Sequence, residues 1–237
     1  MAGGLGRVRR WVLTGAPGAG KTAVLQALAT RGHDVVAEAA TDVIAVLQAQ
    51  GVDEPWTRAD FCDRIALLQR RRQEQPLSPG TRVQVFDRSP LCTLALSRFL
   101  GRAPTPALIA EVDRVVRDEI YEPRVFLVRP LGAIEATAAR RITYADSLRF
   151  EVVHQQVYVE HGFALHHVSV AAVGERAAMV EALIVPPPTG STYPRSDGAA
   201  PRYSRPMPRP HLAAEHRPHT RRGSGEPAVL PGSASGG

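Results

Sequence analysis

Short apolar runs alternate with amphipathic stretches along the first 185 residues of the chain. The continuous runs are typical of strands that are buried on both faces of a parallel sheet. Between them, apolar residues recur at helical spacing, often up to a glycine that ends the helix. The pattern predicts strands over residues 8–13, 33–37, 83–86, 125–128 and within 163–170. It predicts helices over residues 21–31, 43–51, 57–75, 89–100, 105–116, 144–161 and 175–183.

Three of these helices have recognisable starts. Thr57-Arg-Ala-Asp60 resembles a capping box, while Ser89-Pro90 and Thr105-Pro106 each combine a hydroxyl cap with proline at the first helical position. Strands that alternate with helices indicate a parallel sheet covered on both faces. We therefore predict one domain over residues 1–185, a three-layer α/β sandwich with a five-stranded parallel sheet.

The composition changes after Val185. Residues 186–237 hold 11 of the 20 prolines and only three Leu, Ile, Val or Phe residues, so we expect a disordered Pro/Gly/Arg-rich tail. The tail carries seven arginines and three acids, so it accounts for +4 of the formal charge of +6. Because its arginines lack interleaved aromatic residues, nucleic-acid binding is not expected, and the tail is instead a candidate site for a protein partner.

Several classes of protein are excluded by composition. No run approaches the roughly 18 apolar residues of a membrane span, so we expect no membrane partner. Cys62 and Cys92 are the only cysteines and cannot form a disulfide framework or a four-cysteine zinc site. We therefore expect a cytoplasmic location.

A glycine-rich loop follows the first predicted strand and precedes the first predicted helix. Gly15-Ala16-Pro17-Gly18-Ala19-Gly20-Lys21-Thr22 fits the GxxxxGK[ST] spacing of the P-loop. The glycines let backbone N–H groups point inward, and the helix directs its positive end to the same place. The motif predicts that Lys21 reaches the β- and γ-phosphates of a nucleoside triphosphate and that the Thr22 hydroxyl ligates Mg²⁺.

Lys21 is the only lysine in the chain, and asparagine is absent. The Asn-Lys-x-Asp segment by which GTPases recognise guanine is therefore excluded. No LSGGQ-like transporter signature is present, and only the predicted tail follows the sheet, where oligomeric AAA+ machines have a helical lid domain. A small-molecule kinase remains the favoured class.

Acidic and basic residues follow two of the other predicted strands, at the edge where such sheets bind ligands. Asp87 is a candidate for holding Mg²⁺ through water or for accepting a proton from the acceptor hydroxyl, and Arg88 for holding a substrate or phosphate oxygen. The alternative is a surface turn. Glu38 and Asp42 are candidates for holding a substrate hydroxyl or acting as base, the alternative being acids that pair with a helix dipole.

Two further groups of side chains have less specific patterns. Arg140 and Arg141 follow the fourth strand, where these kinases have a lid whose arginines stabilise charge on the transferred phosphoryl group; we take Arg141 as the catalytic candidate. Solvated surface arginines are the alternative. His154, His161 and the pair His166-His167 lack carboxylates at ligand spacing, so we expect ordinary edge or surface histidines.

These features together resemble the NadR-type AAA domain family, which includes ribosylnicotinamide kinases. The resemblance rests on Thr14–Thr22, on Val35–Ala40 with Asp42-Val-Ile44, on Phe86-Asp87-Arg88-Ser-Pro90, and on Tyr158 with Gly162-Phe163. Asp-Arg-Ser is also similar to a motif of deoxynucleoside and thymidylate kinases. The resemblance implies ATP–Mg²⁺-dependent transfer of the γ-phosphoryl group to a hydroxyl, with Lys21, Thr22, Asp87 and Glu38 in the roles given above. NadR itself carries a nucleotidylyltransferase domain before its kinase, so the identity of the acceptor is not carried over.

Two functional hypotheses follow. The first is a kinase acting on a nucleoside-like or ribosylnicotinamide-like acceptor, with ATP and Mg²⁺ as cofactors. The second is a nucleotide-dependent regulatory ATPase that acts through a protein partner, which the basic tail would bind.

Overall fold

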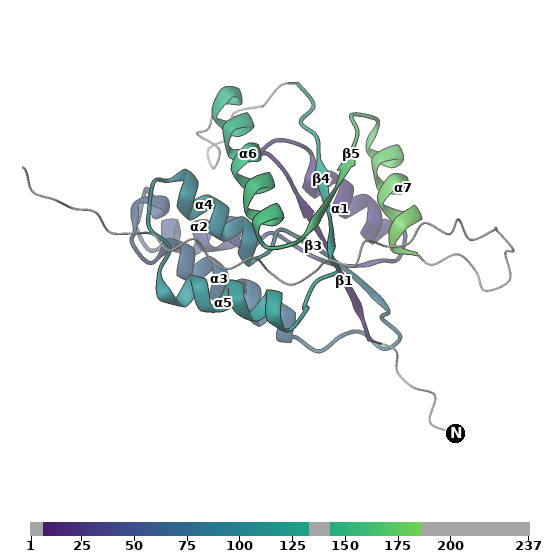
Figure 1. Cartoon of the computed structure of the whole chain (residues 1–237), viewed down its shortest axis with the longest axis horizontal. Helices are drawn as coiled ribbons and strands as arrows, with labels where there is room; N and C mark the ends of the chain where they lie inside the picture. The colour runs from purple at the N-terminus through teal and green to yellow at the C-terminus, as the bar shows by residue number, and fades with distance from the viewer. Residues whose placement is uncertain (1–6, 133–142, 186–237) are drawn as a thin grey trace, which may run out of the picture. The chain divides into compact units, whose positions relative to one another are not determined.

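A five-stranded parallel sheet forms the framework of the domain (Figure 1). The computed structural model describes residues 7–132 and 143–185 of the 237-residue chain. The strands are β1 (Arg9–Thr14), β2 (Asp34–Val36), β3 (Val83–Asp87), β4 (Arg124–Val128) and β5 (Ala164–Val168). They lie in the order β2-β3-β1-β4-β5, and each neighbouring pair is parallel. The fold class predicted from the sequence is confirmed.

Helices connect the strands. They are α1 (Lys21–Thr30), α2 (Ala39–Ala49), α3 (Phe61–Glu74), α4 (Pro90–Phe99), α5 (Pro106–Arg117), α6 (Tyr144–Glu160) and α7 (Val173–Ile184), with a short 3₁₀ helix η1 (Pro55–Thr57) before α3. None of the helices in these described ranges is long and apolar enough to cross a membrane. The predicted tail, residues 186–237, and residues 133–142 lie outside the described part of the chain.

The sheet separates two apolar cores, as the alternation along β1 shows. Val12 faces the core shared with α2, α3, α4, α5 and α6, whereas Trp11 and Leu13 face the core shared with α1 and α7. Successive side chains of a strand point to opposite faces, so a continuous apolar run is what a strand covered on both sides requires. Figure 1 shows α1 and α7 together on one face of the sheet.

Two helix starts differ from the sequence prediction. Thr57 does not begin a capping box: it lies in η1, its hydroxyl donates to the Glu54 carbonyl at 2.7 Å, and α3 begins at Phe61. Because Thr57 belongs to η1 and its hydroxyl is bonded there, it cannot cap α3. α2 begins at Ala39 rather than at Val43, and Glu38 is the residue that precedes its first turn.

The two Ser/Thr-Pro starts behave differently from each other. The Thr105 hydroxyl accepts a hydrogen bond from the Leu108 N–H at 3.1 Å, as a helix cap should. Ser89 occupies the corresponding position of α4, but its hydroxyl bonds the Tyr158 hydroxyl at 2.7 Å instead of the helix backbone. A buried tertiary partner has replaced the local cap.

The strand order places the carboxyl end of β1 at a topological switch point. The chain continues from β1 to β2 and β3 on one side of the sheet, and β4 and β5 lie on the other side. The register pairs Leu13 with both Asp87 of β3 and Phe126 of β4. Loops that leave β1, β2, β3 and β4 therefore meet at one edge, which is where open α/β sheets bind their ligands.

Candidate functional site

The P-loop, residues 15–22, connects β1 to α1. Gly15 is required by its surroundings: its φ is +131°, and a Cβ atom there would lie 2.5 Å from the Val128 carbonyl oxygen of β4. Gly18 and Gly20 also have positive φ, at 80° and 82°. Ala16 and Ala19 are buried, whereas Pro17, Gly18 and Gly20 line a cavity. The loop therefore has the backbone conformation on which a phosphate cradle depends.

Lys21 lies folded back over this loop. Its ammonium group donates to the Gly15 carbonyl at 3.2 Å and to the Ala16 carbonyl at 2.9 Å, and the side chain is buried. Burial, together with the nearby Arg88 charge, lowers the pKa of Lys21 to about 8. A bound polyphosphate would favour the charged form, so anion binding and protonation of Lys21 are linked.

Thr22 and Asp87 meet at the start of α1 and the end of β3. The Thr22 hydroxyl donates to Asp87 Oδ2 at 3.3 Å, while Asp87 Oδ1 is buried without a hydrogen-bond partner. Burial raises the pKa of Asp87. An orphaned carboxylate oxygen beside a hydroxyl oxygen fits Mg²⁺, which is often held by one or two carboxylates, water and substrate phosphates. No cluster of three or more His, Cys, Asp or Glu side chains suited to a metal exists within residues 7–132 and 143–185.

Arg88 lies at the centre of a chain of hydrogen bonds. Its Nε donates to Glu38 Oε1 at 2.5 Å, and its Nη1 donates to His154 Nε2 at 3.0 Å. The second oxygen of Glu38 accepts from the Thr41 hydroxyl at 3.2 Å. On the other side, His154 Nδ1 lies 2.9 Å from the Phe150 carbonyl. Because Nε2 accepts from Arg88, Nδ1 carries the proton and donates to that carbonyl. These hydrogen bonds thus join the segments that follow β2 and β3 to α6.

The charges of this chain are fixed by burial and by pairing. Burial alone would raise the pKa of Glu38, but Arg88 and Lys21 beside it bring the pKa below its ordinary value. Burial alone would lower the pKa of Arg88, and the Glu38 carboxylate more than offsets that effect. Burial and the Arg88 charge lower the pKa of His154 well below its ordinary value. The site therefore holds an ionised Glu38, a charged Arg88 and a neutral His154 at neutral pH.

Arg88 also has an unusual backbone conformation. Its φ is +74°, and its N–H donates to the Leu13 carbonyl of β1 at 3.0 Å. A left-handed conformation costs a residue with a Cβ atom about 1–3 kcal/mol and persists only where the surroundings enforce it. The hydrogen bonds of the Arg88 backbone and side chain provide that enforcement.

A cavity of about 740 Å³ extends from the P-loop to the helices on one face of the sheet. Gly18, Lys21 and Thr22 line its phosphate end, and Glu38 and Arg88 lie on its wall. The remaining lining is mostly apolar, and we call this set the apolar wall: Ala40, Ile44, Trp56, Phe61, Leu96, Phe99, Leu100 and Phe150. Phe99 and Phe150 stack at a centroid separation of 4.6 Å. The cavity therefore combines a phosphate-binding end with an apolar compartment.

Asp42 does not line this cavity. Asp42 is exposed and pairs with Arg72, which also donates to the Ala37 carbonyl, so Asp42 faces away from the lining. We leave it out of the proposed site. Arg141, with Arg140, lies outside the described residues.

Sequence reasoning missed His154. It was expected to be an ordinary edge or surface histidine, but it is completely buried and bonded to Arg88. Its four-residue spacing from Phe150 on α6 gives no signal of its own, because the partner lies 66 positions away in the sequence.

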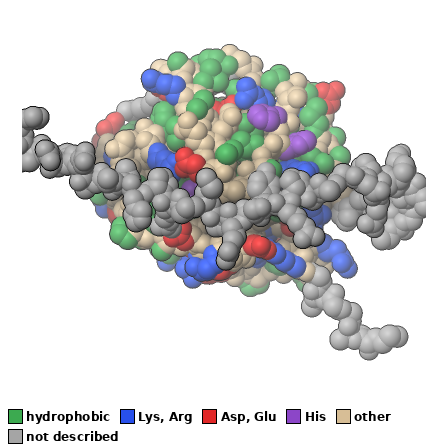
Figure 2. Space-filling view, viewed as in Figure 1, with side chains coloured by type: hydrophobic (Ala, Val, Ile, Leu, Met, Phe, Trp, Pro, Cys, Tyr) green, Lys and Arg blue, Asp and Glu red, His purple; other side chains and the backbone are tan. Residues whose placement is uncertain are grey.

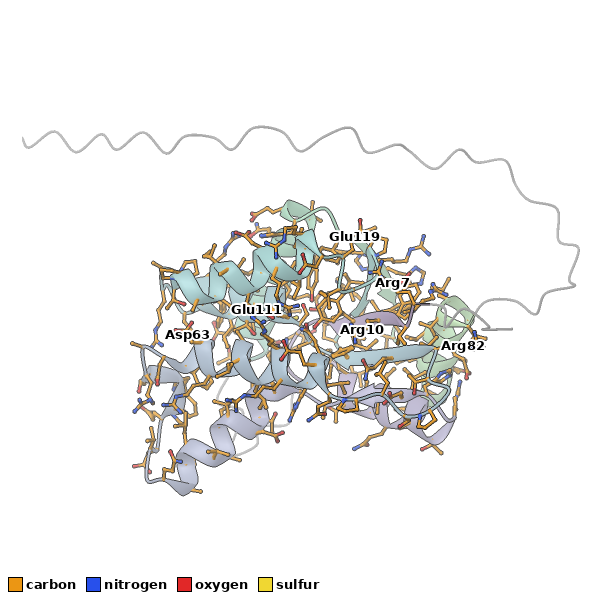
Figure 3. All side chains as sticks on the ribbon, turned by 90° about the horizontal axis from the view of Figure 1, so that it is seen from below. Arg7, Arg10, Asp63, Arg82, Glu111 and Glu119 are labelled. Carbon is orange, nitrogen blue, oxygen red and sulfur yellow. The ribbon has the colours of Figure 1, made fainter. Side chains whose placement is uncertain are left out.

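Several charged side chains elsewhere in the described part of the chain form ion pairs or hydrogen bonds. Figure 2 shows basic side chains scattered over one face among acidic ones. Near the amino ends of the strands, Arg7 forms an ion pair with Glu119, and Glu111 forms one with Arg114 (Figure 3). Arg10 donates to the Gln84 side chain and the Gln73 carbonyl.

Comparison with known proteins agrees with this geometry. A family model described as AAA domain matches residues 10–176. The chain belongs to this family. No curated protein matches the sequence.

Among solved structures, deoxyadenosine kinase from M. mycoides with the products dCMP and a flexible dCDP bound has a TM-score of 0.51. Its identity is 12%, over 73% of this chain and 97% of that one. The same kinase with bound dATP has a TM-score of 0.48 and an identity of 12%, over 74% of this chain and 98% of that one. Shikimate kinase from Acinetobacter baumannii in complex with shikimate has a TM-score of 0.40 and an identity of 18%, over 75% of this chain and 93% of that one. The first of these likenesses shows that the domain has the fold of a P-loop kinase.

Proposed function

We propose that this AAA-domain protein is a small-molecule kinase that transfers the γ-phosphoryl group of ATP to a hydroxyl of a nucleoside-like or ribosylnicotinamide-like acceptor. The observation that carries the proposal is the continuous cavity, in which a P-loop opens directly onto an apolar compartment large enough for a small molecule. Glu38 and Arg88 lie where the two ends of the cavity meet.

At the phosphate end, backbone N–H groups of the P-loop and the Lys21 ammonium group would bind the β- and γ-phosphates. Thr22 and Asp87 would hold Mg²⁺, which neutralises charge on the phosphate oxygens when bound. The Asp87 carboxylate is already within hydrogen-bond distance of Thr22, so both ligands are positioned before the nucleotide arrives. The main contribution of the protein here is electrostatic preorganisation.

At the acceptor end, the ionised Glu38 carboxylate would accept the proton of the acceptor hydroxyl. The acceptor oxygen forms a bond to the γ-phosphorus while the bond from that phosphorus to the β,γ-bridging oxygen breaks, so ADP leaves. Arg88, fixed between Glu38 and His154, would place its charge beside the transferred group. Arg141 retains its sequence-based role as a lid arginine that stabilises the same charge. The apolar wall would bind the non-reacting part of the acceptor and exclude water.

The proposal is tested by measuring ADP release from ATP and Mg²⁺ with a panel of nucleosides, ribosylnicotinamide and nucleoside monophosphates. We expect at least one acceptor to raise turnover well above the rate without acceptor, and the Lys21→Ala variant to abolish that increase. Arg98→Met serves as a matched control, because Arg98 is an exposed residue paired with Glu160 outside the cavity. If no member of the panel raises ADP release above the Lys21→Ala variant, the kinase proposal is rejected.

A further inference from the structure

Arg176 of α7 is the largest fully buried side chain among the described residues. Its Nη1 donates to the Ala19 carbonyl of the P-loop at 2.9 Å, and its Nη2 donates to the Arg129 carbonyl, just after β4, at 2.7 Å. One guanidinium group thus links the phosphate loop, the end of a central strand and the last helix of the domain. Such a bidentate contact fixes both carbonyls in one geometry.

This guanidinium group has no carboxylate partner within residues 7–132 and 143–185, and its Nε is buried with no hydrogen bond. The other arginines near the loop differ. Arg88 pairs with Glu38, and Arg129 pairs with Glu151. An uncompensated buried charge is costly, so proteins seldom keep one without an anion to neutralise it. The P-loop beside Arg176 is a site built to receive an anion.

The contact also orients the loop. The chain has no cis peptide bond in its described parts, so the Ala19 carbonyl and the Gly20 N–H point in opposite directions within their shared peptide plane. Arg176 binds the carbonyl on one side, and Gly20 lines the cavity on the other. Arg176 is close to Gly20 as well, because a Cβ atom there would lie 3.1 Å from Nη1. A cation on the carbonyl strengthens the N–H as a donor through the polarised peptide.

We propose that Arg176 is a positioning residue for nucleotide binding, which holds the Ala19–Gly20 peptide with its N–H toward the polyphosphate and whose buried charge the polyphosphate neutralises. The inference rests on the proposed function only in placing a nucleotide at this P-loop. It adds a contribution from outside the P-loop sequence motif, made 157 positions away in the chain.

The test measures the affinity of the full-length chain for ADP and for tripolyphosphate by calorimetry, without acceptor. We expect Arg176→Met to weaken both by about tenfold or more, the effect of losing one charged hydrogen bond. Arg176→Lys keeps the charge but loses the two-carbonyl contact, so its loss should be smaller. Val180→Ala is the matched control, because Val180 is a buried apolar residue of the same helix that makes no hydrogen bond to a P-loop carbonyl.

The outcomes separate the two proposals. If the wild-type chain binds neither probe, the proposed function fails and this inference with it. If the wild-type chain binds and folded Arg176→Met binds equally well, the inference alone is overturned. It is also overturned if Val180→Ala weakens ADP binding as much as Arg176→Met, because the effect would then be general loosening of α7. If Arg176→Met does not fold, the Arg176→Lys variant is used instead. Wild-type affinity of Arg176→Lys for ADP and tripolyphosphate overturns the inference, and weaker affinity for both probes supports it.

Discussion

The two ends of the cavity are built in different ways. The phosphate end is made of eight consecutive residues whose backbone conformation follows from three glycines and the start of α1. The acceptor end is made of side chains from separate elements, and the Arg88 guanidinium group joins residues 50 and 66 positions away. The phosphate end therefore depends mainly on local conformation and on Lys21, with Asp87 and Arg176 as its distant contributors. The acceptor end depends on a chain of hydrogen bonds that is half-buried at Glu38 and Arg88 and buried at His154.

This difference predicts how each end responds to substitution. A backbone cradle tolerates the loss of distant side chains other than the few that contact it, here Asp87 and Arg176, whereas a hydrogen-bonded chain transmits the loss of any link to the others. The following predictions are ordered from the largest expected effect to the smallest, and each compares the two ends.

Lys21→Ala should give the largest loss. Removing the ammonium group that lies over the P-loop should lower kcat by about 10³-fold, because a preorganised charge at the transferred phosphoryl group is lost. The measurement is the single-turnover rate of ADP formation with saturating acceptor. Acceptor affinity, measured separately by calorimetry, should stay within about twofold of wild type, since the lysine donates its hydrogen bonds to P-loop carbonyls and not to the acceptor end. A variant that keeps a tenth of the wild-type rate would contradict this assignment.

Arg88→Met should affect both activity and folding. We expect kcat/KM to fall about 10²-fold, and the free energy of unfolding to fall by about 2 kcal/mol because the half-buried Glu38 loses its charged hydrogen-bond partner. Urea titration and steady-state kinetics measure the two effects. The surface variant Arg98→Met should change neither appreciably. If Arg88→Met loses activity but no stability, the Glu38–Arg88 ion pair does not stabilise the fold as we describe.

Nucleotide affinity should fall as the pH rises past about 8, the pKa of buried Lys21. Above that pH the free protein loses the lysine proton that phosphate binding requires, so the dissociation constant for ADP should rise about tenfold per pH unit until the pKa of the bound state is reached. In Lys21→Arg, which stays charged, the affinity should be nearly independent of pH between 7.5 and 9.5, a range set by the lysine pKa of about 8. An identical profile for both proteins would show that Lys21 does not control this dependence.

His154 should give a smaller effect that depends on the acceptor end. His154→Phe removes the acceptor for Arg88 and should lower kcat/KM by about tenfold, whereas His154→Gln keeps an acceptor and should recover most of the activity. The folded pKa of His154 is depressed, so its stability contribution is present above the unfolded pKa of about 6.5 and is lost as the pH falls below it. Wild-type stability should therefore decline from about pH 6.5 to 5 more steeply than that of His154→Gln. Equal slopes, or no rescue by glutamine, would exclude the positioning role.

The phosphate end could be predicted from the sequence more fully than the acceptor end. The strands and the P-loop were predicted because their signals are local, continuous apolar runs for the strands and a fixed spacing of Gly15, Gly20 and Lys21 for the loop. Asp87 and Arg88 were placed at the correct edge because parallel strands share one carboxyl edge. His154 could not be predicted, since only the packing of α6 against the end of β3 gives it a partner. Asp42 shows the reverse error, because a residue at the right sequence position is bound by Arg72 instead.

The central claim is that the γ-phosphoryl group passes to a hydroxyl bound in the apolar compartment. Phosphorus NMR of the wild-type protein with ATP, Mg²⁺ and the most active acceptor of the panel tests it most directly. The account predicts a new phosphomonoester signal that grows in step with ADP, with little inorganic phosphate. Inorganic phosphate as the sole product, formed at a rate that does not depend on the acceptor, would contradict it.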